Sequence, residues 1–595
     1  MAIMSVVEKK KVIFVDFFDT IMHRHIHPLS VIARARKVSK SNGDNYLPIL
    51  KCAEIGCQYP NLKLIKKLKN FKNNGKRIYI VSDFQMGKDD YIDFLKAKNI
   101  DISLFDDIFV SCECGCSKSE GGLYSYVLQK IGADATDVLM IGDNKDVDGK
   151  NAKRYGIDSL IIPHYWKKAL NQVKRFLNFD YSRIAARTIR RDLYHYGSPY
   201  SEYSILFYLS TRELYKQLYD RGQKNVVFLA REGHFLKRAF DSYQRFFKDK
   251  NNSIETSYLK CSRRAAQSLI PSALKELENR QISICDYLMA HGFSKDEIDD
   301  ISKKFDIQGD IHENTYLNQN PAYLRLLSSQ SYNELIEKKR AANIKAGKQY
   351  FDTFNYGKTL NLVDIGWRGC MQDTIGKILD KNVEGYYVGL NDSELDLNNR
   401  VGLLFSSCPN QGVYSPWSQI LKANIQLYEQ LTAAPHGSAV GYSLNGGEPI
   451  VIEDWVENEK KLYYEKIESK QEELILNILG LAAWCEEKEY KVLLRLCAKT
   501  VLRSGLFADS NRLAFLKSLD EGFVWNFDKQ TKGIKYKTND VKVRKDIILS
   551  PEKYTRYVVK IQRSVNDKGK FAMALYYPFA ILIYGYIWFI NCLKN

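Results

Sequence analysis

Five polar residues in the first 150 positions have the types and spacing that phosphoryl transfer requires: Asp16, Ser82, Lys118, Asp143 and Asp148. Asp16 follows the apolar run VIFV and can attack phosphorus. Ser82 offers a hydroxyl donor, and Lys118 can neutralise the charge of the phosphate and of the nucleophile. The segment IGDNKDVD supplies Asp143 and Asp148, whose oxygens suit Mg²⁺. The set therefore predicts a magnesium-dependent phosphoryl site.

Neighbouring polar residues extend this site. Thr20 can hydrogen-bond to the loop or to phosphoryl oxygens, and we place Asp83 and Asn144 with it as substrate-binding residues. Asp146 is a second-choice metal ligand. Each fragment alone could be a helix cap, a solvated lysine or a polar turn. Their order along the chain, each at the end of a strand or the start of a helix, favours a site.

The elements around these residues alternate short apolar runs with helical stretches over residues 1 to 165. VIFV, RIYIVS, DIFVS, VLMIG and SLIIP read as strands of a doubly wound parallel sheet. Residues 21 to about 75 interrupt the alternation and predict a small helical cap. We therefore expect an α/β domain whose strand ends converge on the site.

These motifs resemble the haloacid-dehalogenase-like (HAD) hydrolase superfamily, through VDFFDT, VSD, the lysine of SKSEGG, and IGDNKDVD followed by GKNAKRYGI. The resemblance implies that Asp16 is the nucleophile and a metal ligand, and that Ser82 and Lys118 hold the phosphoryl group. It implies Mg²⁺ as the cofactor, with a metal set of Asp16, Phe18, Asp143 and Asp148.

One position departs from that pattern. Phosphatases of the superfamily usually carry an acid/base Asp two residues after the nucleophile, where this chain has Phe18, and Asp19 comes one residue late. Loss of general acid catalysis would slow turnover by about 10²- to 10⁴-fold. Three alternatives stay open: Asp19 is the catalytic substitute, turnover is slow, or the domain senses phosphate or acts as a scaffold without catalysis.

A second α/β, Rossmann-like domain is predicted over residues 191 to 450, after a basic helical linker at 166 to 190. Its strand candidates are KNVVFLA, TSYLKCS, TLNLVDIG and GYYVGL, with a helical insert at about 270 to 350. Charged residues follow several of these strands and predict a second ligand crevice, with the candidates Arg231, Glu232, Ser262, Arg263, Arg264, Asp364, Trp367, Arg368, Glu429 and His436.

Arg263 and Arg368 would suit a phosphate or pyrophosphate, and Trp367 could stack on a sugar or base. Helix-capping turns and buried ion pairs are the competing interpretation. The segments FLAREG, SRRA, VDIGW and YEQLTAAPHGS, combined with the first domain, look like predicted hydrolases associated with bacterial surface-polysaccharide synthesis.

That second resemblance implies a role in capsule or O-antigen assembly, with a phosphorylated sugar, nucleotide-sugar or glycan-phosphate substrate. The alternative is a glycosyltransferase or glycan-phosphate transferase in the C-terminal domain, with an accessory first domain. A nonenzymatic, membrane-peripheral adaptor is the third interpretation.

Composition points to anionic partners. The chain has 88 Lys and Arg against 70 acidic residues, a net charge of +18. With no nucleic-acid-binding motif, phosphorylated molecules or an anionic membrane surface are favoured over nucleic acid. The absence of a signal peptide and the 12 cysteines predict a cytoplasmic protein with reduced thiols.

Residues 451 to 595 are predicted to be mainly helical, and they end in an uncharged stretch, 571 to 592, flanked by Lys568, Lys570 and Lys594. That length could span a bilayer as a tail anchor. Pro578 and four tyrosines fit an interfacial or a buried helix equally well. Peripheral or tail-anchored attachment at the inner membrane therefore stays open.

Two further clusters predict no metal site. Cys112, Cys114 and Cys116 lack a second pair at zinc spacing and are interpreted as an ordinary loop. His23, His25 and His27 alternate as on a strand face, but lead into the cap and are interpreted as loop.

Overall fold

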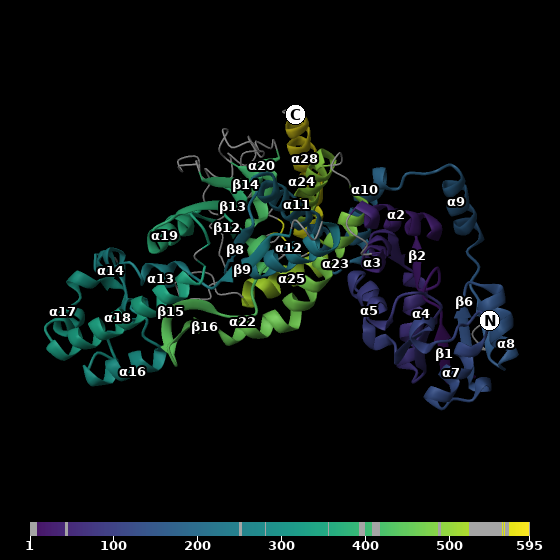
Figure 1. Cartoon of the computed structure of the whole chain (residues 1–595), viewed down its shortest axis with the longest axis horizontal. Helices are drawn as coiled ribbons and strands as arrows, with labels where there is room; N and C mark the ends of the chain where they lie inside the picture. The colour runs from purple at the N-terminus through teal and green to yellow at the C-terminus, as the bar shows by residue number, and fades with distance from the viewer. Residues whose placement is uncertain are drawn as a thin grey trace. The chain divides into compact units, whose positions relative to one another are not determined.

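The computed structural model describes residues 9–41, 46–248, 253–279, 281–354, 356–391, 399–406, 417–485, 490–522, 562, 565 and 570–593. The chain divides into two compact units (Figure 1). Unit 1 comprises residues 1–209, 242–252 and 469–500, and unit 2 comprises residues 210–241, 253–468 and 501–595. The segment 469–500 thus returns to unit 1 although it follows the second sheet in the chain.

Unit 1 is built on a five-stranded parallel sheet in the order β5-β4-β1-β6-β7. Its strands are β1 (Val12–Val15), β4 (Arg77–Ser82), β5 (Asp107–Val110), β6 (Val138–Gly142) and β7 (Asp158–Ile161). All four residues of β1 are buried, as expected for a central strand covered by helices on both faces. The predicted parallel α/β sheet is confirmed.

The helices of unit 1 cover this sheet and build the cap. Two helices and a short antiparallel strand pair form the inserted module: β2 (Met22–Arg24), α2 (Pro28–Ser41), α3 (Tyr46–Cys57) and β3 (Gln58–Pro60). His23 therefore lies in a strand. The other elements are α4 (Leu62–Asn73), α5 (Lys88–Ala97), η1 (Ile102–Leu104), α6 (Ser111–Cys114), α7 (Gly122–Ile131), η2 (Ala135–Asp137), η3 (Lys145–Asn151), α8 (Ala152–Arg154), α9 (Tyr165–Phe176), α10 (Ser182–Tyr196), η4 (Ser201–Tyr203) and α23 (Glu468–Trp484). The first six residues of α11 (Ser204–Asp220) belong to unit 1 and the rest to unit 2. Cys112 and Cys114 lie on α6, so the predicted loop begins only after them.

Apolar packing on one face of the sheet fixes the strand ends that bear the site. Val12, Phe14 and Met140 are fully buried there against α7, through Leu123 and Val127. Because interiors are packed to near crystal density, the two strands that precede the acidic residues cannot slide relative to each other without opening cavities.

Unit 2 contains a second five-stranded parallel sheet, in the order β14-β13-β12-β8-β9. The strands are β8 (Asn225–Leu229), β9 (Glu255–Leu259), β12 (Thr359–Asp364), β13 (Asn382–Leu390) and β14 (Arg400–Ser406). A second α/β sheet was predicted and is confirmed, although β14 was not among the predicted strands. Its helices include α12 (Gly233–Phe247), α13 (Arg263–Gln267) and α19 (Cys370–Leu379).

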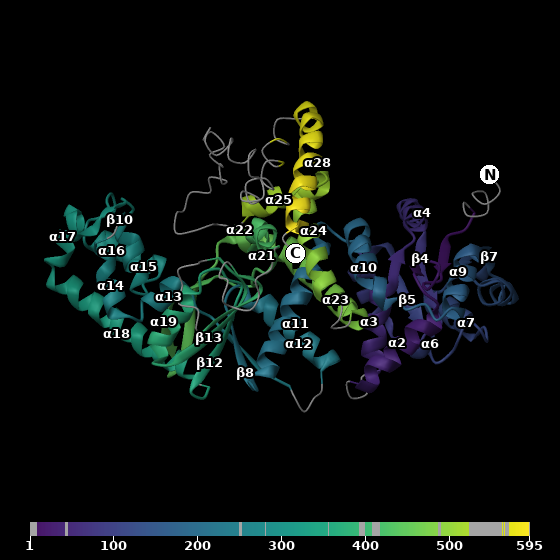
Figure 2. The same ribbon diagram turned by 90° about the horizontal axis from the view of Figure 1, so that it is seen from above.

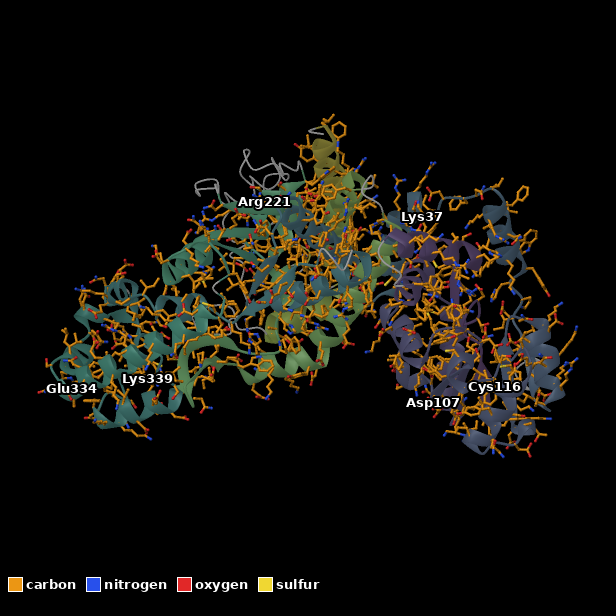
Figure 3. All side chains as sticks on the ribbon, in the orientation of Figure 1. Lys37, Asp107, Cys116, Arg221, Glu334 and Lys339 are labelled. Carbon is orange, nitrogen blue, oxygen red and sulfur yellow. The ribbon has the colours of Figure 1, made fainter. Side chains whose placement is uncertain are left out.

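The helical insert of unit 2 has its own apolar core, which includes Ile284, Leu288 and Tyr323. Its elements form one cluster at an end of unit 2 in both Figure 1 and Figure 2: α14 (Pro271–Leu277), β10 (Gln281–Ile282), α15 (Ile284–Ala290), α16 (Lys295–Lys304), β11 (Thr315–Tyr316), η6 (Leu317–Gln319), α17 (Pro321–Leu327) and α18 (Gln330–Asp352). Lys339 and Glu334, labelled in Figure 3, lie on α18. Lys339 also pairs with Glu297 of α16 at 2.7 Å.

The later part of the chain adds short helices, a hairpin and the terminal helix: α20 (Ser418–Leu421), η7 (Lys422–Asn424), α21 (Ile425–Leu431), β15 (Ser438–Asn445), β16 (Glu448–Asp454), α22 (Glu457–Leu462), η8 (Tyr463–Ile467), α24 (Tyr490–Leu506), α25 (Ser510–Gly522) and α28 (Lys570–Leu593). Within α28, Phe571–Ile590 is long and apolar enough to cross a membrane, and 22% of it is buried. Its predicted flanking residues Lys568 and Lys594 lie outside the described residues.

Candidate active site

The strand order of unit 1 creates a crevice between β1 and β6. From β1 the chain continues to β4 and β5 on one side of the sheet, and later to β6 and β7 on the other. At such a topological switch point the connections that follow the two neighbouring strands run in opposite directions. Ligands bind in the crevice that this leaves beyond the carboxyl ends of the strands. Asp16 follows β1 and Asp143 follows β6, and the neighbouring positions Val15 and Ile141 are paired in the sheet.

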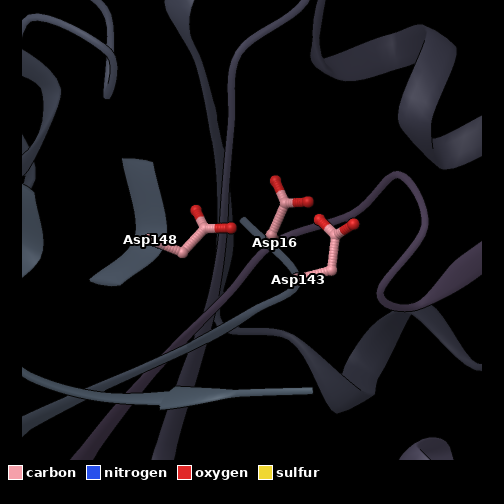
Figure 4. Close-up of side chains that lie close together, drawn as sticks. All are labelled: Asp16, Asp143 and Asp148. Carbon is pink, nitrogen blue, oxygen red and sulfur yellow. The ribbon is translucent and has the colours of Figure 1, made fainter. Parts of the chain in front are cut away.

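Three carboxylates meet in this crevice. Asp16, Asp143 and Asp148 each offer an oxygen, and these atoms lie within 4.8 Å of one another (Figure 4). The side chains of Asp143 and Asp148 are 10% and 2% exposed. An all-oxygen donor set in a partly enclosed site fits Mg²⁺, which retains some of its waters and takes one or two carboxylates. The structure therefore brings together carboxylates that are separated by more than a hundred positions in the sequence.

Lys118 is a buried cation that pairs with two of the three carboxylates. Its Nζ lies 2.7 Å from Asp16 Oδ1 and 2.7 Å from Asp148 Oδ1. The backbone N–H groups of Lys118 and Ser119 donate to Asp83, at 2.7 and 3.0 Å. Asp83 thus fixes the loop that presents the lysine. Its predicted role in substrate binding stays a prediction.

Burial and like charge perturb the acidic groups. Burial raises the pKa of Asp16 to about 7; Lys118 opposes this rise, while Asp148 and Asp143 add to it. Burial also raises the pKa of Asp143. Burial works against the charge of Lys118, but Asp16 and Asp148 outweigh it and raise the pKa of that ammonium. Three carboxylates that lie this close together repel one another, so the site favours positive charge, which Lys118 and Lys168 supply in part.

The other predicted residues of this site take supporting positions. Thr20 Oγ1 donates to Asp16 Oδ2 at 3.5 Å, and Ser82 is buried at the end of β4. The Asn144 N–H donates to Asp148 Oδ2 at 3.1 Å, while its side chain accepts from the N–H groups that open η3. Asp146 is 75% exposed, pairs with Lys150 and lies outside the carboxylate cluster.

Phe18 and Asp19 differ sharply in their surroundings. The Phe18 ring lies 4.3 Å from the ring of Phe84 and 4.3 Å below the Arg24 guanidinium, so only its backbone carbonyl can serve a metal. Asp19 accepts from Arg24 Nη1 at 3.0 Å. Arg24 is buried and donates twice to Glu54, at 2.9 and 3.1 Å. Arg24 therefore positions the Asp19 carboxylate.

A cavity of about 580 Å³ adjoins these groups. Asp19, Asp143 and Asn144 line it together with residues from the cap and from α9, namely His23, Arg24, His27, Pro28, His164, Lys167, Lys168, Ala169, Asn171 and Gln172. Its volume suits a small phosphate ester. Lys168 Nζ lies 2.6 Å from Asp143 Oδ2. Sequence reasoning treated α9 as part of a linker and missed its contribution to this wall.

The cavity histidines favour the neutral form. Burial, with Lys167 and His164 nearby, lowers the pKa of His23 to about 4. Burial likewise lowers the pKa of His164 and of His27. Neutral imidazoles can donate one hydrogen bond and accept another without adding charge. His25 instead lies 2.5 Å from Asp192, outside the cavity.

Unit 2 has its own switch point, between β8 and β12. Glu232 follows β8 and Asp364 ends β12. Burial, with Glu232 and Glu429 nearby, raises the pKa of Asp364 to about 8, while Arg263 opposes the rise. Glu232, Arg263 and Glu429 are therefore near enough to Asp364 to act on it electrostatically, and the predicted ligand crevice stays a prediction.

Several of the remaining predicted residues of unit 2 have protein partners. The Trp367 indole N–H donates to Glu429 at 2.7 Å, and the ring stacks on Phe405 with centroids 5.9 Å apart. Arg231 pairs with Glu459 at 2.8 Å. His436 Nε2 lies 2.7 Å from the Tyr258 hydroxyl. Ser262 caps α13, Arg263 and Arg368 are exposed, and Arg264 is half-buried.

Comparisons with known proteins bear on unit 1. Residues 115–164 match the family model described as HAD-hydrolase-like. No curated protein matches the chain. A putative haloacid dehalogenase-like hydrolase from Bacteroides fragilis is 17% identical and covers 25% of this chain and 86% of its own, with a TM-score of 0.21.

Two further solved structures are similar over the same share of the chain. A HAD family enzyme from Bacteroides thetaiotaomicron, in complex with magnesium and inorganic phosphate, is 15% identical and covers 26% of this chain and 93% of its own, with a TM-score of 0.20. A predicted HAD-like family hydrolase from Porphyromonas gingivalis is 13% identical and covers 28% and 98%, with a TM-score of 0.21. The family-model match includes Lys118, Asp143 and Asp148, and it supports a haloacid-dehalogenase-like hydrolase domain in the N-terminal part of the chain.

Proposed function

We propose that unit 1 is a magnesium-dependent phosphohydrolase or phosphotransferase. The observation that supports this most directly is the meeting of Asp16, Asp143 and Asp148 at the switch point of a parallel sheet, with Lys118 paired to Asp16 and Asp148. Bound Mg²⁺ would supply charge stabilisation for the phosphoryl oxygens. Asp16, Asp143 and Asp148 would hold it.

The residues of the site suit a two-step transfer. Asp16 attacks phosphorus, so that a carboxylate oxygen to phosphorus bond forms and the ester bond to the leaving group breaks. The leaving oxygen takes a proton, and Asp19, at the wall of the cavity, is our candidate donor. Water, or an acceptor hydroxyl, then attacks phosphorus and gives its proton to Asp19, while the bond between the Asp16 oxygen and phosphorus breaks and frees the Asp16 carboxylate. Lys118 balances the charge on the transferred group, and the Ser82 hydroxyl donates a hydrogen bond to it.

We propose a phosphorylated sugar, a nucleotide-sugar or a glycan-phosphate as the substrate, in the assembly of a bacterial surface polysaccharide such as capsule or O-antigen. A cavity lined by His23, His27, Asn171 and Gln172 offers hydrogen-bonding groups for sugar hydroxyls, and Lys167 offers positive charge. The resemblance of the whole chain to predicted hydrolases of that process supports the same substrate class.

Release of inorganic phosphate from an aryl phosphate tests this function. We expect release that requires Mg²⁺, stops with a chelator, and falls by at least about 10³-fold in Asp16→Asn, which keeps the shape but removes the nucleophile. Asp137→Asn, at the opposite end of β6, is the matched control and should keep wild-type activity. Release that persists without metal, or in Asp16→Asn, would refute the proposal.

A second candidate function belongs to unit 2. The grouping of Glu232, Asp364 and Glu429 at the second switch point favours transfer of a glycosyl or glycan-phosphate group there, with unit 1 accessory or noncatalytic. Cleavage of nucleotide sugars by the Asp16→Asn variant, together with loss of that cleavage in the Asp364→Asn variant, would favour this function. The reverse pattern would exclude it.

A further inference from the structure

Two lysines pair with the three carboxylates of the candidate metal site. Lys118 binds Asp16 and Asp148, and Lys168 Nζ lies 2.6 Å from Asp143 Oδ2. A metal ion held by one oxygen of Asp143 would lie within about 5 Å of an ammonium group held by the other oxygen, and the two cations would repel each other. An ion that uses Asp143 as a ligand therefore works against the pairing of Lys168.

The two lysines differ in how easily they can leave the site. Lys118 is 3% exposed and is shared between two carboxylates, so its departure would leave buried charges without a partner. The Lys168 side chain is 53% exposed, and water can solvate its ammonium group as soon as it leaves Asp143. Lys168 is therefore the cation of this pair that an incoming metal ion displaces.

The helix that carries Lys168 is held to unit 1 by polar contacts. None of the residues of α9 is buried. Asn171 Nδ2 and Lys174 Nζ donate to backbone carbonyls of the cap, at 3.4 and 2.7 Å. The Lys167 ammonium lies 5.1 Å from the centroid of the Tyr59 ring. Because few apolar contacts anchor α9, losing the ion pair of Lys168 loosens the helix.

We propose that Lys168 competes with Mg²⁺ for Asp143 and thereby couples metal binding to the position of α9. The proposal rests on the metal site of the proposed function, and it adds a regulatory role for a residue outside the carboxylate cluster. While Lys168 is paired with Asp143, α9 is held beside the cavity that Lys168 helps to line. By linkage, removing the lysine strengthens Mg²⁺ binding, and Mg²⁺ in turn loosens α9.

Calorimetric titration of the full chain with MgCl₂ tests the competition without any enzymatic reaction. We expect Lys168→Met to bind Mg²⁺ with a Kd about three- to tenfold lower than that of wild type, because a partly exposed ion pair no longer opposes binding. Lys168→Arg keeps the charge and should stay near wild type. Lys167→Met is the matched control, because it removes a neighbouring charge from the same cavity wall, and it should change Kd by less than about twofold. Binding that disappears in Asp143→Asn is the binding at this site.

Hydrogen–deuterium exchange of the amides of residues 165–176 tests the coupling. Saturating MgCl₂ should speed exchange of wild-type α9 at least about threefold, because the helix has lost one of its contacts. Lys168→Met should exchange fast both with and without Mg²⁺. The amides of α4, which contributes no residue to the cavity lining, are the internal control and should not exchange faster with Mg²⁺.

The outcomes separate this proposal from the proposed function. Equal Mg²⁺ affinity of wild type and Lys168→Met would overturn the competition and leave the metal site in place. An equal gain of affinity in Lys167→Met would assign the effect to the overall charge of the cavity wall and would also overturn it. Wild-type α9 that exchanges no faster with Mg²⁺ would overturn the coupling. Absence of Mg²⁺ binding from all of these proteins, with circular dichroism showing that they are folded, would refute the metal site itself.

Discussion

At the residue scale, Phe18 is the position that most affects turnover. The family pattern places an acid/base Asp there, and the phenyl ring instead packs on Phe84 beneath Arg24. Arg24 already holds Asp19 and Glu54, so a carboxylate introduced at position 18 would lie beside a cation. Arg24 would therefore favour the ionised, proton-accepting form of that carboxylate.

We expect Phe18→Asp to increase the rate of phosphate release from an aryl phosphate by about 10²-fold or more, because it adds an acid/base carboxylate at the position where the family pattern carries one, beside the Asp19 that we propose as donor. It should also lower the melting temperature, since the aromatic contacts are lost. Phe18→Ala is the control, because it loses the same packing without adding a carboxyl group. Equal rates in wild type and both variants would show that the missing acid does not limit turnover.

Lys118 stabilises the fold as well as the site. Its ammonium is 3% exposed and binds two carboxylates, so Lys118→Met would leave Asp16 and Asp148 buried without their cation. We expect a loss of about 3 to 5 kcal/mol in the free energy of unfolding with a chelator present. Added Mg²⁺ should restore more stability to the variant than to wild type.

The matched control for this prediction is Lys150→Met, which breaks the exposed ion pair with Asp146. That change should cost less than about 1 kcal/mol, because water already solvates both charges. Urea denaturation measures the free energy of unfolding of wild type, Lys118→Met and Lys150→Met. A similar small loss in Lys118→Met and Lys150→Met would mean that the carboxylates at the site do not depend on the lysine.

At the element scale, the strands that precede the site could be predicted because each is a short apolar run between polar turns. VIFV and VLMIG are buried on both faces of the sheet. Continuous apolar runs of this kind can be recognised from the sequence alone, without knowing which strands they pair with. The hairpin of β15 and β16 was missed, although Asn445, Gly446 and Gly447 form a turn of the kind that joins two strands. The short apolar run of β14 could not be told from a helical segment by its pattern.

The end of β12 gives the element-scale prediction. The pKa of Asp364 is raised from 3.8 to about 8. Between these values the folded state holds a proton that the unfolded state has released, so the free energy of unfolding falls as pH rises, and it levels off above about 8. Asp364→Asn cannot ionise, so we expect it to unfold like wild type near pH 4 and to be more stable near pH 9.

Thermal unfolding across that pH range measures the difference, with Asp352→Asn on the exposed side of α18 as the control. The control should follow the wild-type curve at every pH. If Asp364→Asn also follows that curve, Asp364 is ionised in the folded protein, and the crevice of unit 2 is more accessible to water than its burial indicates.

At the scale of the whole molecule, each unit places its candidate residues beside the first strand of its sheet. Asp16 follows β1, and Glu232 follows β8, and in both sheets the chain departs from that strand in two directions. Polar residues at strand ends could be read from the sequence. The return of residues 469–500 to unit 1 could not, because the Asn477 and Trp484 side chains donate to carbonyls of Ala97 and Ala53, more than 300 positions away. The closing of the cavity by α9 escaped prediction for the same reason.

The terminal helix α28 is long and apolar enough to cross a membrane, and its packing bears on whether it does. Tyr576, Ala580, Ile583 and Ile587 are buried along one side, and the Tyr576 hydroxyl donates to the Leu506 carbonyl at 3.1 Å. The opposite side is exposed and apolar, with Leu575 at 66% and Leu582 at 74%. A helix that spans a membrane is surrounded by lipid along its length, whereas one face of α28 is covered by other residues of unit 2.

We therefore expect peripheral attachment, because withdrawing α28 from unit 2 would expose its buried face and leave the Leu506 carbonyl without that donor. Alkaline carbonate should release the full chain from membranes into the supernatant, since helices that lie on a bilayer are held far more weakly than helices that span it. Leu582→Glu should weaken any lipid contact of the exposed side without unfolding unit 2, whereas Ile587→Glu should lower the melting temperature. A chain that stays in the membrane pellet after carbonate, and leaves it only when residues 570–593 are deleted, would show that α28 parts from unit 2 and crosses the bilayer.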